Sequence, residues 1–348
     1  MTRVAVIGAG SWGTAVAGIL ATNSDDVVLW ARRPELADAV MTAHENPDYL
    51  AGVALPERLR ATSDLEAACA AAEVVVMGVP SHGLRAVLTK ASSYIDPTVP
   101  VVSLIKGVEQ ETNRRATEII AEELGRTGGD QVGVLTGPNL AREIAGGQPA
   151  ASVVAFADGD VARALQGLFM TGTFRVYTNP DVVGCEIAGA VKNVMAIAAG
   201  IAHGLGYGDN TMAALLTRGL AELARLGTAM GGHALTFGGL AGMGDLVATC
   251  TSDKSRNRTV GVELGKGRAL DDIVTEMRMV AEGVKSTRGV LELASQHDVE
   301  MPIAEQVGAV LYEGRTPEEV VPALMMRQAK AEDHGLLEAR RRGQSRSS

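Results

Sequence analysis

The chain has few aromatic residues, few cysteines and no excess of positive charge. Aromatic residues make up 3% of the sequence against 46% hydrophobic residues, so the core must consist of Ala, Val, Leu, Ile and Met. The three cysteines, Cys69, Cys185 and Cys250, lie far apart with no CxxC spacing, which is typical of a reduced compartment. The net charge of −9 argues against nucleic acid as a partner, because binding a polyanion needs clustered basic residues.

Targeting and membrane signals are also missing. The chain starts Met-Thr-Arg-Val and enters a predicted strand rather than a signal sequence. The most apolar stretch, residues 187–202, contains Lys192 and falls short of the run of about 18 uncharged apolar residues that a membrane span needs. We therefore expect a cytoplasmic protein without membrane insertion.

A chain of 348 residues exceeds one typical core, and its patterning predicts two domains. Up to residue 180, Val/Ile-rich runs alternate with helical segments, which predicts an α/β domain with a mostly parallel sheet and helices on both faces. Residues 181–335 are rich in Ala, Leu and Gly and predict an all-helical domain, and the basic residues 336–348 predict a disordered tail. The predicted strands are residues 4–7, 26–30, 73–80, 99–107, 131–139, 151–155 and 173–177.

The first predicted strand runs directly into a GxGxxG turn that opens a helix. In this position Gly8 makes the tight turn, Gly10 lets the backbone approach a pyrophosphate, and Gly13 brings the helix against the strand. The helix N-terminus then presents free N–H groups to an anion. The context predicts a dinucleotide-binding domain.

Arg32 and Arg33 follow the second predicted strand, where an acidic residue usually binds the adenosine ribose and an arginine accommodates a 2′-phosphate. No carboxylate stands there, so we expect NADP(H) as the favoured cofactor, with NAD(H) as the alternative. The competing interpretation is that both arginines are solvated loop charges.

Lys192 and Asn193 are the only polar residues between residues 187 and 202, so this helix should be buried nearly all round. No residue one turn away from Lys192 is acidic. Desolvation disfavours the cation of a buried lysine and favours proton exchange with an alcohol or carbonyl. The alternative is a lysine whose stem crosses the core while its head reaches water.

Further polar segments carry a carboxylate for such a lysine and residues that could bind a phosphate. The glycine-rich segment 239–246 carries Asp245, and Ser255, Arg256 and Asn257 suit a phosphate monoester unless they belong to a solvated loop. Lys106, and the run Gly137-Pro138-Asn139, lie at the carboxyl ends of predicted strands, where ligands bind in open α/β folds.

These motifs, in this order, resemble the bacterial NAD(P)-dependent glycerol-3-phosphate dehydrogenases. The resemblance runs from residue 4 to about residue 330 and rests on the residues quoted above together with Gly107, Val191 and Met243. It implies a Rossmann-type first domain, a helical second domain, and interconversion of dihydroxyacetone phosphate and sn-glycerol 3-phosphate, usually as reduction, for phospholipid synthesis. Family members often carry Ser or Thr where this chain has Asn139.

The resemblance also implies site residues. Lys192 would be the proton donor and acceptor, with Asp245 supporting it. The substrate would be lined by Lys106, Gly137, Asn139, Lys192, Asp245, Ser255, Arg256 and Asn257. The cofactor would contact Gly8, Gly10, Ser11, Trp12, Gly13, Arg32, Arg33, Lys106, Ala141, Arg256, Val280 and Glu282.

No metal site is predicted, because no histidine shows metal-ligand spacing. The Met-bearing helical surfaces of the second domain suggest a homodimer. Three alternatives stay open: a dehydrogenase of 6-phosphogluconate or ketopantoate, a nicotinamide-sensing regulator, and a thiol mechanism through Cys185 or Cys250.

Overall fold

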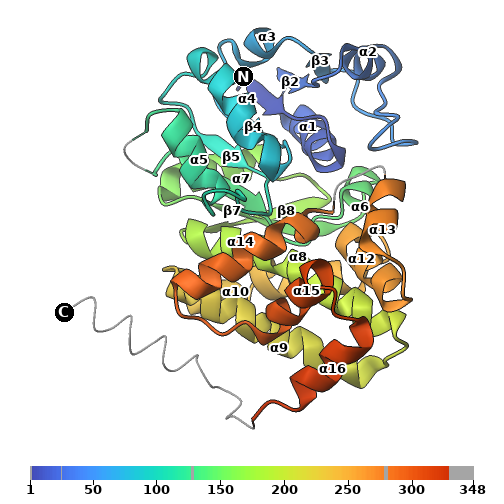
Figure 1. The fold of residues 1–348 in the computed structure, drawn as a ribbon. Coiled ribbons are helices and arrows are strands. Elements are labelled where there is room, and N and C mark those ends of the chain that lie inside the picture. Colours follow the sequence, from blue (N-terminus) through green and yellow to red (C-terminus); the bar gives the residue numbers. More distant parts are fainter. Residues whose placement is uncertain (1, 25, 127–128, 278–280, 329–348) are drawn as a thin grey trace, which may run out of the picture. The chain divides into compact units, whose positions relative to one another are not determined.

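The computed structural model describes residues 2–24, 26–126, 129–277 and 281–328 (Figure 1). The tail predicted for residues 336–348 lies outside this range. Contacts between Cα atoms divide the chain into two compact units. Unit 1 comprises the described residues from 2–105 and 114–182, and unit 2 those from 106–113 and 183–328. The chain therefore changes unit three times, because the short segment 106–113 belongs to unit 2.

Unit 1 is built on one sheet with the strand order β3-β2-β1-β4-β5-β6-β7-β8. Neighbouring strands are parallel except for the antiparallel pair β6 and β7, which confirms the predicted mostly parallel sheet. The strand β3 was not predicted, because its Arg-Ala-Thr sequence has no apolar run. The strands are β1 (Val4–Ile7), β2 (Val27–Trp30), β3 (Arg60–Thr62), β4 (Val74–Met77), β5 (Val101–Ser103), β6 (Val132–Thr136), β7 (Ala150–Ala155) and β8 (Phe174–Asn179).

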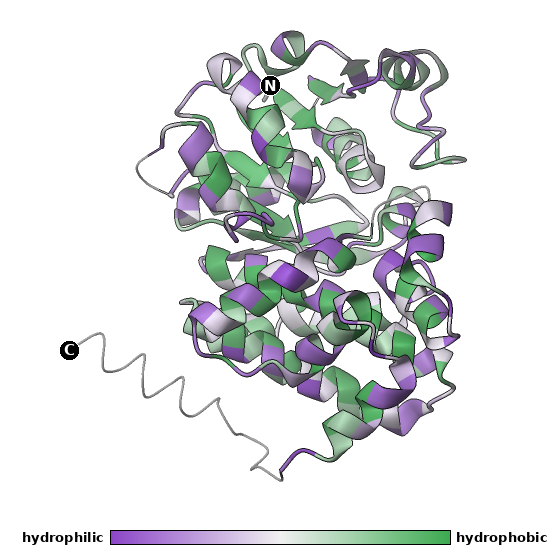
Figure 2. Ribbon diagram, viewed as in Figure 1, coloured by the Kyte–Doolittle hydropathy of each residue, from purple (hydrophilic) through white to green (hydrophobic). Residues whose placement is uncertain are grey.

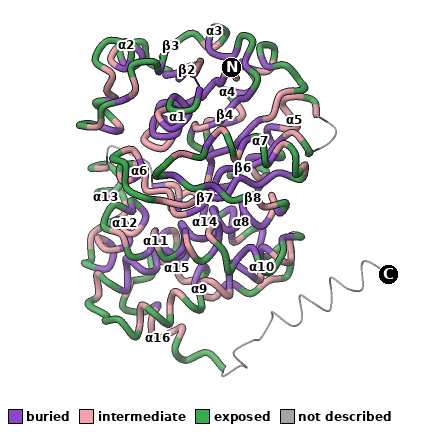
Figure 3. The backbone as a smooth tube through the Cα atoms, turned by 180° about the vertical axis from the view of Figure 1, so that it is seen from behind, coloured by how far each residue is buried: buried purple, intermediate pink, exposed green. Residues whose placement is uncertain are grey.

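Alternate residues of the central strands enter two separate cores. Val4 and Val6 belong to the core that also contains residues of α1, α2 and α7, whereas Ala5 and Ile7 belong to the core with α3, α4 and α5. Because both faces are covered, the central strands β1, β2 and β4 are apolar throughout, and the middle of the sheet appears hydrophobic in Figure 2 and buried in Figure 3. The helices of unit 1 are α1 (Ser11–Asn23), α2 (Pro34–Ala43), α3 (Leu65–Cys69), α4 (Leu84–Ala91), α5 (Ala116–Glu123), α6 (Ala141–Ala145) and α7 (Gly159–Phe169).

From α8 onward, the secondary-structure elements of unit 2 that the structure describes are all helices, as predicted. All residues from 184 to 202 of its longest helix, α8, are buried. By length and composition α8 could cross a membrane, but 83% of its most apolar window is buried inside the protein, as in a core helix. The helices are α8 (Val182–Gly204), α9 (Asp209–Ala229), α10 (Ala234–Phe237), α11 (Asp245–Thr251), α12 (Arg256–Gly265), α13 (Leu270–Glu276), α14 (Glu282–Gln296), α15 (Pro302–Tyr312) and α16 (Pro317–Met325), with a π-helical turn at Leu240–Gly244.

The backbones of α8 and α12 touch where glycines face each other. A Cβ at Gly200 would lie 2.1 Å from the carbonyl oxygen of Arg258, and one at Gly261 would lie 2.1 Å from that of Ile197. No larger side chain fits at this crossing without moving a helix. The crossing fixes α12 against the C-terminal half of α8, the helix that carries the buried lysine.

Gly261→Ala should destabilise unit 2 by about 2 kcal/mol or more, because the added methyl overpacks a backbone contact. We expect a fall of about 5 °C or more in the thermal unfolding midpoint, measured by circular dichroism. Gly167→Ala on α7 is the matched control: nothing lies within 4 Å of its Cβ position, so helix propensity should make it neutral or stabilising. Equal midpoints for the two variants would contradict a tight crossing.

Candidate active site

The turn between β1 and α1 has room for an anion. Gly8 has a φ of +123°, a left-handed conformation that favours glycine, and a Cβ at Gly13 would lie 2.0 Å from the Gly8 carbonyl oxygen. At Gly10, by contrast, nothing lies within 4 Å of the Cβ position. Gly8 and Gly13 therefore shape the turn, and Gly10 leaves it open at the N-terminus of α1, as a bound pyrophosphate requires.

A loop after α2 holds this turn in place, and the sequence analysis missed it. The buried Asn46 donates to the carbonyl oxygen of Ala9 at 2.9 Å and to the hydroxyl of Thr14 at 2.8 Å. Its own oxygen accepts the backbone N–H of Tyr49 at 3.0 Å. The hydroxyl of Ser11 in turn donates to the Tyr49 carbonyl at 2.7 Å. A polar residue followed by Pro-Asp after a helix was the only signal for this role.

The arginines after β2 lie in different environments. Arg33 forms an ion pair and hydrogen bond with Asp48, which raises the pKa of this exposed guanidinium. Arg32 is exposed, and no ion pair joins it to another described residue. The structure thus leaves Arg32 available to a phosphate while Arg33 already has a carboxylate partner.

The remaining cofactor candidates are placed as follows. Trp12 packs edge-on against Phe174, with ring centroids 6.2 Å apart, and its buried indole N–H has no hydrogen-bond partner. Ala141 is the first residue of α6, and Glu282 is the first residue of α14. Val280 lies outside the described residues. The open Gly10 turn, the unpaired Arg32 and the unpartnered Trp12 N–H fit a dinucleotide phosphate in unit 1.

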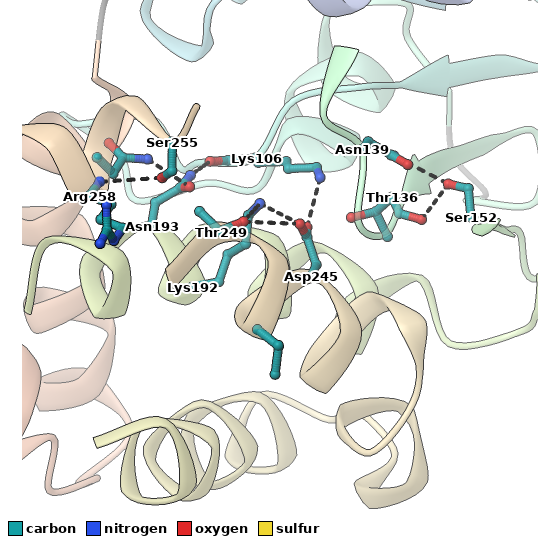
Figure 4. Close-up of polar contacts among 12 residues, drawn as sticks. Lys106, Thr136, Asn139, Ser152, Lys192, Asn193, Asp245, Thr249, Ser255 and Arg258 are labelled. Atoms are coloured by element: carbon teal, nitrogen blue, oxygen red, sulfur yellow. Dashed lines mark hydrogen bonds and ion pairs between the residues drawn. The ribbon is translucent and has the colours of Figure 1, made fainter. Parts of the chain in front are cut away.

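Asn139 lies after β6 in unit 1 beside a second strand. Its side-chain amide donates to the Ser152 hydroxyl at 3.2 Å, and that hydroxyl donates to the carbonyl oxygen of Thr136 at 2.7 Å (Figure 4). Gly137 has a φ of +137°. The side-chain oxygen of Asn139 is buried without a partner, so it can accept one more hydrogen bond.

In unit 2, two lysines share one buried carboxylate. Lys192 on α8 donates to Asp245 Oδ1 at 2.5 Å, and Lys106 donates to Asp245 Oδ2 at 2.7 Å (Figure 4). The side chain of Lys192 is 7% exposed and that of Asp245 is 1% exposed. Lys192 therefore does not reach water as a lysine with a solvated head would. Its partner comes from α11, since α8 itself offers none near it.

Thr249 completes the Lys192 contacts. Its hydroxyl lies one helical turn after Asp245 and accepts from Lys192 Nζ at 2.7 Å. The sequence analysis missed this residue, although the i, i+4 spacing from Asp245 was visible. Lys192 thus has two oxygen partners, which fix the direction of its ammonium group.

Burial shifts the pKa of Lys106, the second lysine of this cluster. Desolvation lowers the pKa of Lys106 to about 8; the Asp245 carboxylate opposes this shift and the Lys192 ammonium adds to it. The stem of Lys106 passes over Gly189 of α8, where a Cβ would lie 3.3 Å from Lys106 Cγ. Two ammonium groups around one carboxylate leave the cluster with a net positive charge.

A chain of amides joins this cluster to α12 and α14. Asn193 donates to the Lys106 carbonyl at 2.8 Å, Asn257 donates to the Asn193 oxygen at 2.9 Å, and the Gly283 N–H donates to the Asn257 oxygen at 2.9 Å. The side-chain amides of Asn193 and Asn257 form the middle of this chain, and the bond from Asn193 fixes the backbone at Lys106 relative to α8.

The segment predicted to bind phosphate divides into two parts. Residues 252–254 form the partly exposed loop that the alternative interpretation expected, whereas Ser255 is buried and caps α12 by accepting the N–H of Arg258 at 3.3 Å. Arg256 is exposed at the first position of α12, within electrostatic range of Glu282. Arg256 therefore adds a positive charge at the N-terminus of α12, where the helix dipole also favours an anion.

The thiol mechanism finds no support at Cys250. Burial raises the pKa of this thiol to about 12, which disfavours a thiolate. Cys185 is also buried and free of disulfides. Within the described residues, no group of three or more His, Cys, Asp or Glu side chains is arranged to hold a metal ion.

A dinucleotide-binding turn on a mostly parallel sheet, followed by a helical unit with a paired lysine, defines the class of two-domain nicotinamide-dependent dehydrogenases. Residues 3–162 match the N-terminal model, and residues 181–322 the C-terminal model, of NAD-dependent glycerol-3-phosphate dehydrogenase. The chain belongs to this family.

Relatives span nearly the whole chain. The glycerol-3-phosphate dehydrogenase (NAD(P)+) 2 of Sphingopyxis alaskensis is 54% identical over 332 residues, covering 95% of this chain and 98% of the relative. The enzyme of Thermobifida fusca is 52% identical over 337 residues, covering 97% and 100%. The crystal structure of glycerol-3-phosphate dehydrogenase from Coxiella burnetii has a TM-score of 0.88 at 38% identity and covers 94% and 99%.

The alternative ketopantoate reductase assignment shares only the fold. A ketopantoate reductase from Ralstonia eutropha matches 92% of this chain with a TM-score of 0.56 at 16% identity. The 16% identity to this ketopantoate reductase, against 54% and 52% for the two glycerol-3-phosphate dehydrogenases, places the chain with the latter.

Asp245→Asn should lower the free energy of unfolding of unit 2 by about 3 kcal/mol, because two buried ammonium groups lose their shared carboxylate. Denaturant unfolding at neutral pH measures this effect. Asp253→Asn is the control: its 92% exposed carboxylate pairs with Arg258 at the surface, so the change should cost less than about 1 kcal/mol. Similar costs for both variants would contradict a buried charge cluster.

Proposed function

We propose that this protein is an NAD(P)-dependent sn-glycerol-3-phosphate dehydrogenase that interconverts dihydroxyacetone phosphate and sn-glycerol 3-phosphate. The observation that carries the proposal is the Lys192–Asp245–Lys106 cluster in a chain of this family. A buried, oriented ammonium group beside a second cation suits a reaction in which negative charge grows on a carbonyl oxygen.

We assign cofactor binding to the domain at residues 1–180 and substrate binding to the domain at residues 181–335. NAD(P)H supplies the hydride that the substrate carbonyl carbon receives. The Gly8–Gly13 turn and Ser11 would hold the pyrophosphate, and Arg32 with Arg33 the 2′-phosphate. This assignment favours NADP(H) and also admits NAD(H). The other proposed cofactor contacts are Trp12, Lys106, Ala141, Arg256, Val280 and Glu282.

Lys192 is the proposed proton donor in reduction and acceptor in oxidation. As the C2 carbonyl of dihydroxyacetone phosphate receives a hydride at carbon, the C=O π pair moves to oxygen, and that oxygen takes a proton from Lys192 Nζ. Asp245 and Thr249 act as positioning residues, because their oxygens lie 2.5 and 2.7 Å from that nitrogen. Neutral Lys192 then regains a proton from water that enters when the product leaves.

We assign the phosphate of the substrate to positive groups of the helical unit. Arg256 and the N-terminus of α12 would bind it together with Ser255 and Asn257, and Lys106 adds a further positive charge. Binding energy from the phosphate then positions the reacting carbon. Gly137 and Asn139 are proposed to contact the substrate as well, with the unpartnered Asn139 oxygen accepting from a substrate hydroxyl.

The wider assignments follow from the activity and the composition. We propose that the enzyme acts in the cytoplasm without membrane insertion, as a homodimer, and that it works mainly as a reductase supplying glycerol 3-phosphate to phospholipid synthesis. The low cysteine content and net charge of −9 support a reduced compartment and a small-molecule substrate.

The assignment predicts oxidation of NADPH, and of NADH to a smaller extent, when dihydroxyacetone phosphate is added. Loss of absorbance of the reduced nicotinamide measures it. Ketopantoate and the keto product of 6-phosphogluconate should give no turnover above background. Ketopantoate carries no phosphate, and in the keto product more carbons separate the carbonyl from the phosphate than in dihydroxyacetone phosphate. No activity on dihydroxyacetone phosphate with either cofactor would overturn the assignment.

Lys192→Ala should lower kcat by about a hundredfold or more while the Kd for NADPH changes little. Asp245 keeps Lys106 as its partner in this variant, so the fold should persist. Lys266→Ala, which removes a 56% exposed lysine of the same unit, is the control and should behave like the wild type. Turnover near that of the control would exclude Lys192 as the proton donor.

A further inference from the structure

Asp48 places a carboxylate where the sequence showed only arginines. In dinucleotide-binding domains an acidic residue near the end of the second strand selects NAD(H), and an arginine there selects NADP(H). Here the second strand ends at Trp30 without a carboxylate, and Asp48 arrives from the loop between α2 and β3 to pair with Arg33. The protein therefore places a carboxylate and an arginine, which favour different cofactors, side by side near the end of the second strand.

The position of Asp48 is built into the fold rather than left to a mobile side chain. Its neighbours Asn46 and Tyr49 bind the turn at Ala9 and Ser11, and the N–H of Leu50 donates to the Asn46 carbonyl at 2.9 Å. The backbone on both sides of Asp48 is therefore fixed to the glycine-rich turn. The carboxylate stays next to Arg33 as long as the turn is intact.

The Arg33–Asp48 pair is accessible to a ligand. The side chains are 49% and 45% exposed, and Arg32 beside them is exposed. A 2′-phosphate that approaches Arg33 must displace or repel the Asp48 carboxylate, whereas an uncharged 2′-hydroxyl can donate a hydrogen bond to it.

We propose that Asp48 sets the balance between NADPH and NADH by competing with the 2′-phosphate for Arg33. This inference rests on the proposed function, in which Arg32 and Arg33 bind that phosphate. Arg32 provides the unopposed cation that favours NADPH, and Asp48 limits the contribution of Arg33, so that NADH remains a usable cofactor.

The test measures Kd for NADPH and NADH without substrate, by fluorescence titration of the full chain. Asp48→Asn should increase the ratio of Kd for NADH to Kd for NADPH by about threefold or more, the scale of one exposed ion pair. The fragments 2′,5′-ADP and 5′-AMP isolate the phosphate effect: the variant should bind the first more tightly and the second no more tightly. Raised ionic strength should shrink the change.

Three variants control for charge and for the role of Arg33. Asp48→Glu keeps the carboxylate and should preserve the wild-type ratio. Asp38→Asn removes an equal charge from the exposed face of α2, away from any described ion pair, and should leave the ratio unchanged. In an Arg33→Ala background, Asp48→Asn should lose most of its effect, since the competition requires Arg33.

The outcomes separate this inference from the proposed function. If Arg32→Ala and Arg33→Ala leave NADPH binding unchanged, or the wild type binds neither nucleotide, the phosphate assignment itself fails and the inference with it. If Arg33→Ala weakens NADPH binding but Asp48→Asn leaves the ratio unchanged or lowers it, only the inference is overturned. A lowered ratio would mean that Asp48 orients Arg33 toward the phosphate instead of competing with it.

Discussion

A single carboxylate shared by two buried ammonium groups is the constraint on which the helical unit depends. With Asp245 1% exposed, the charges of Lys192 and Lys106 are stabilised mainly by that one anion. The arrangement leaves one positive charge in excess, in surroundings with little water. In the proposed reaction such a site would attract an anionic substrate and stabilise an oxyanion, so the excess charge that costs folding energy would also serve the chemistry.

The scarcity of aromatic residues and the abundance of small ones explain how this cluster is held. Glycine contacts bring the backbones of α8 and α12 together at Gly200 and Gly261, and Gly189 lets the stem of Lys106 lie on α8. Backbone packing of this kind leaves side-chain amides, rather than bulky apolar groups, to set the spacing between elements. The amides of Asn193 and Asn257 do so here.

The residue patterns were sufficient for the architecture and for a buried lysine, but the partners of that lysine could not be derived from local pattern, and the supporting role of Asp245 was expected only through the family resemblance. Val/Ile runs predicted the sheet because strands covered on both faces must be apolar, while β3 carries no such signal. The isolation of Lys192 among apolar residues predicted a buried lysine. That Lys192 and Lys106 both pair with Asp245 depends on contacts between residues 53 and 139 positions apart, which no local pattern encodes. The same holds for Asp48 and Arg33.

The segment 106–113 makes the two units inseparable by a single cut in the chain. It leaves unit 1 after Ile105 and returns at Arg114, and within unit 2 it packs Val108 into the hydrophobic core and bonds Asn113 to Glu292 at 2.6 Å. A fragment ending near residue 180 would carry this segment without the partners of Val108 and Asn113. The complementary fragment would lack Lys106 and keep Asp245 with only one cation. One of the two cations that pair with Asp245 is therefore encoded inside the part of the sequence that builds the sheet unit, so the complete charge cluster requires both parts of the chain.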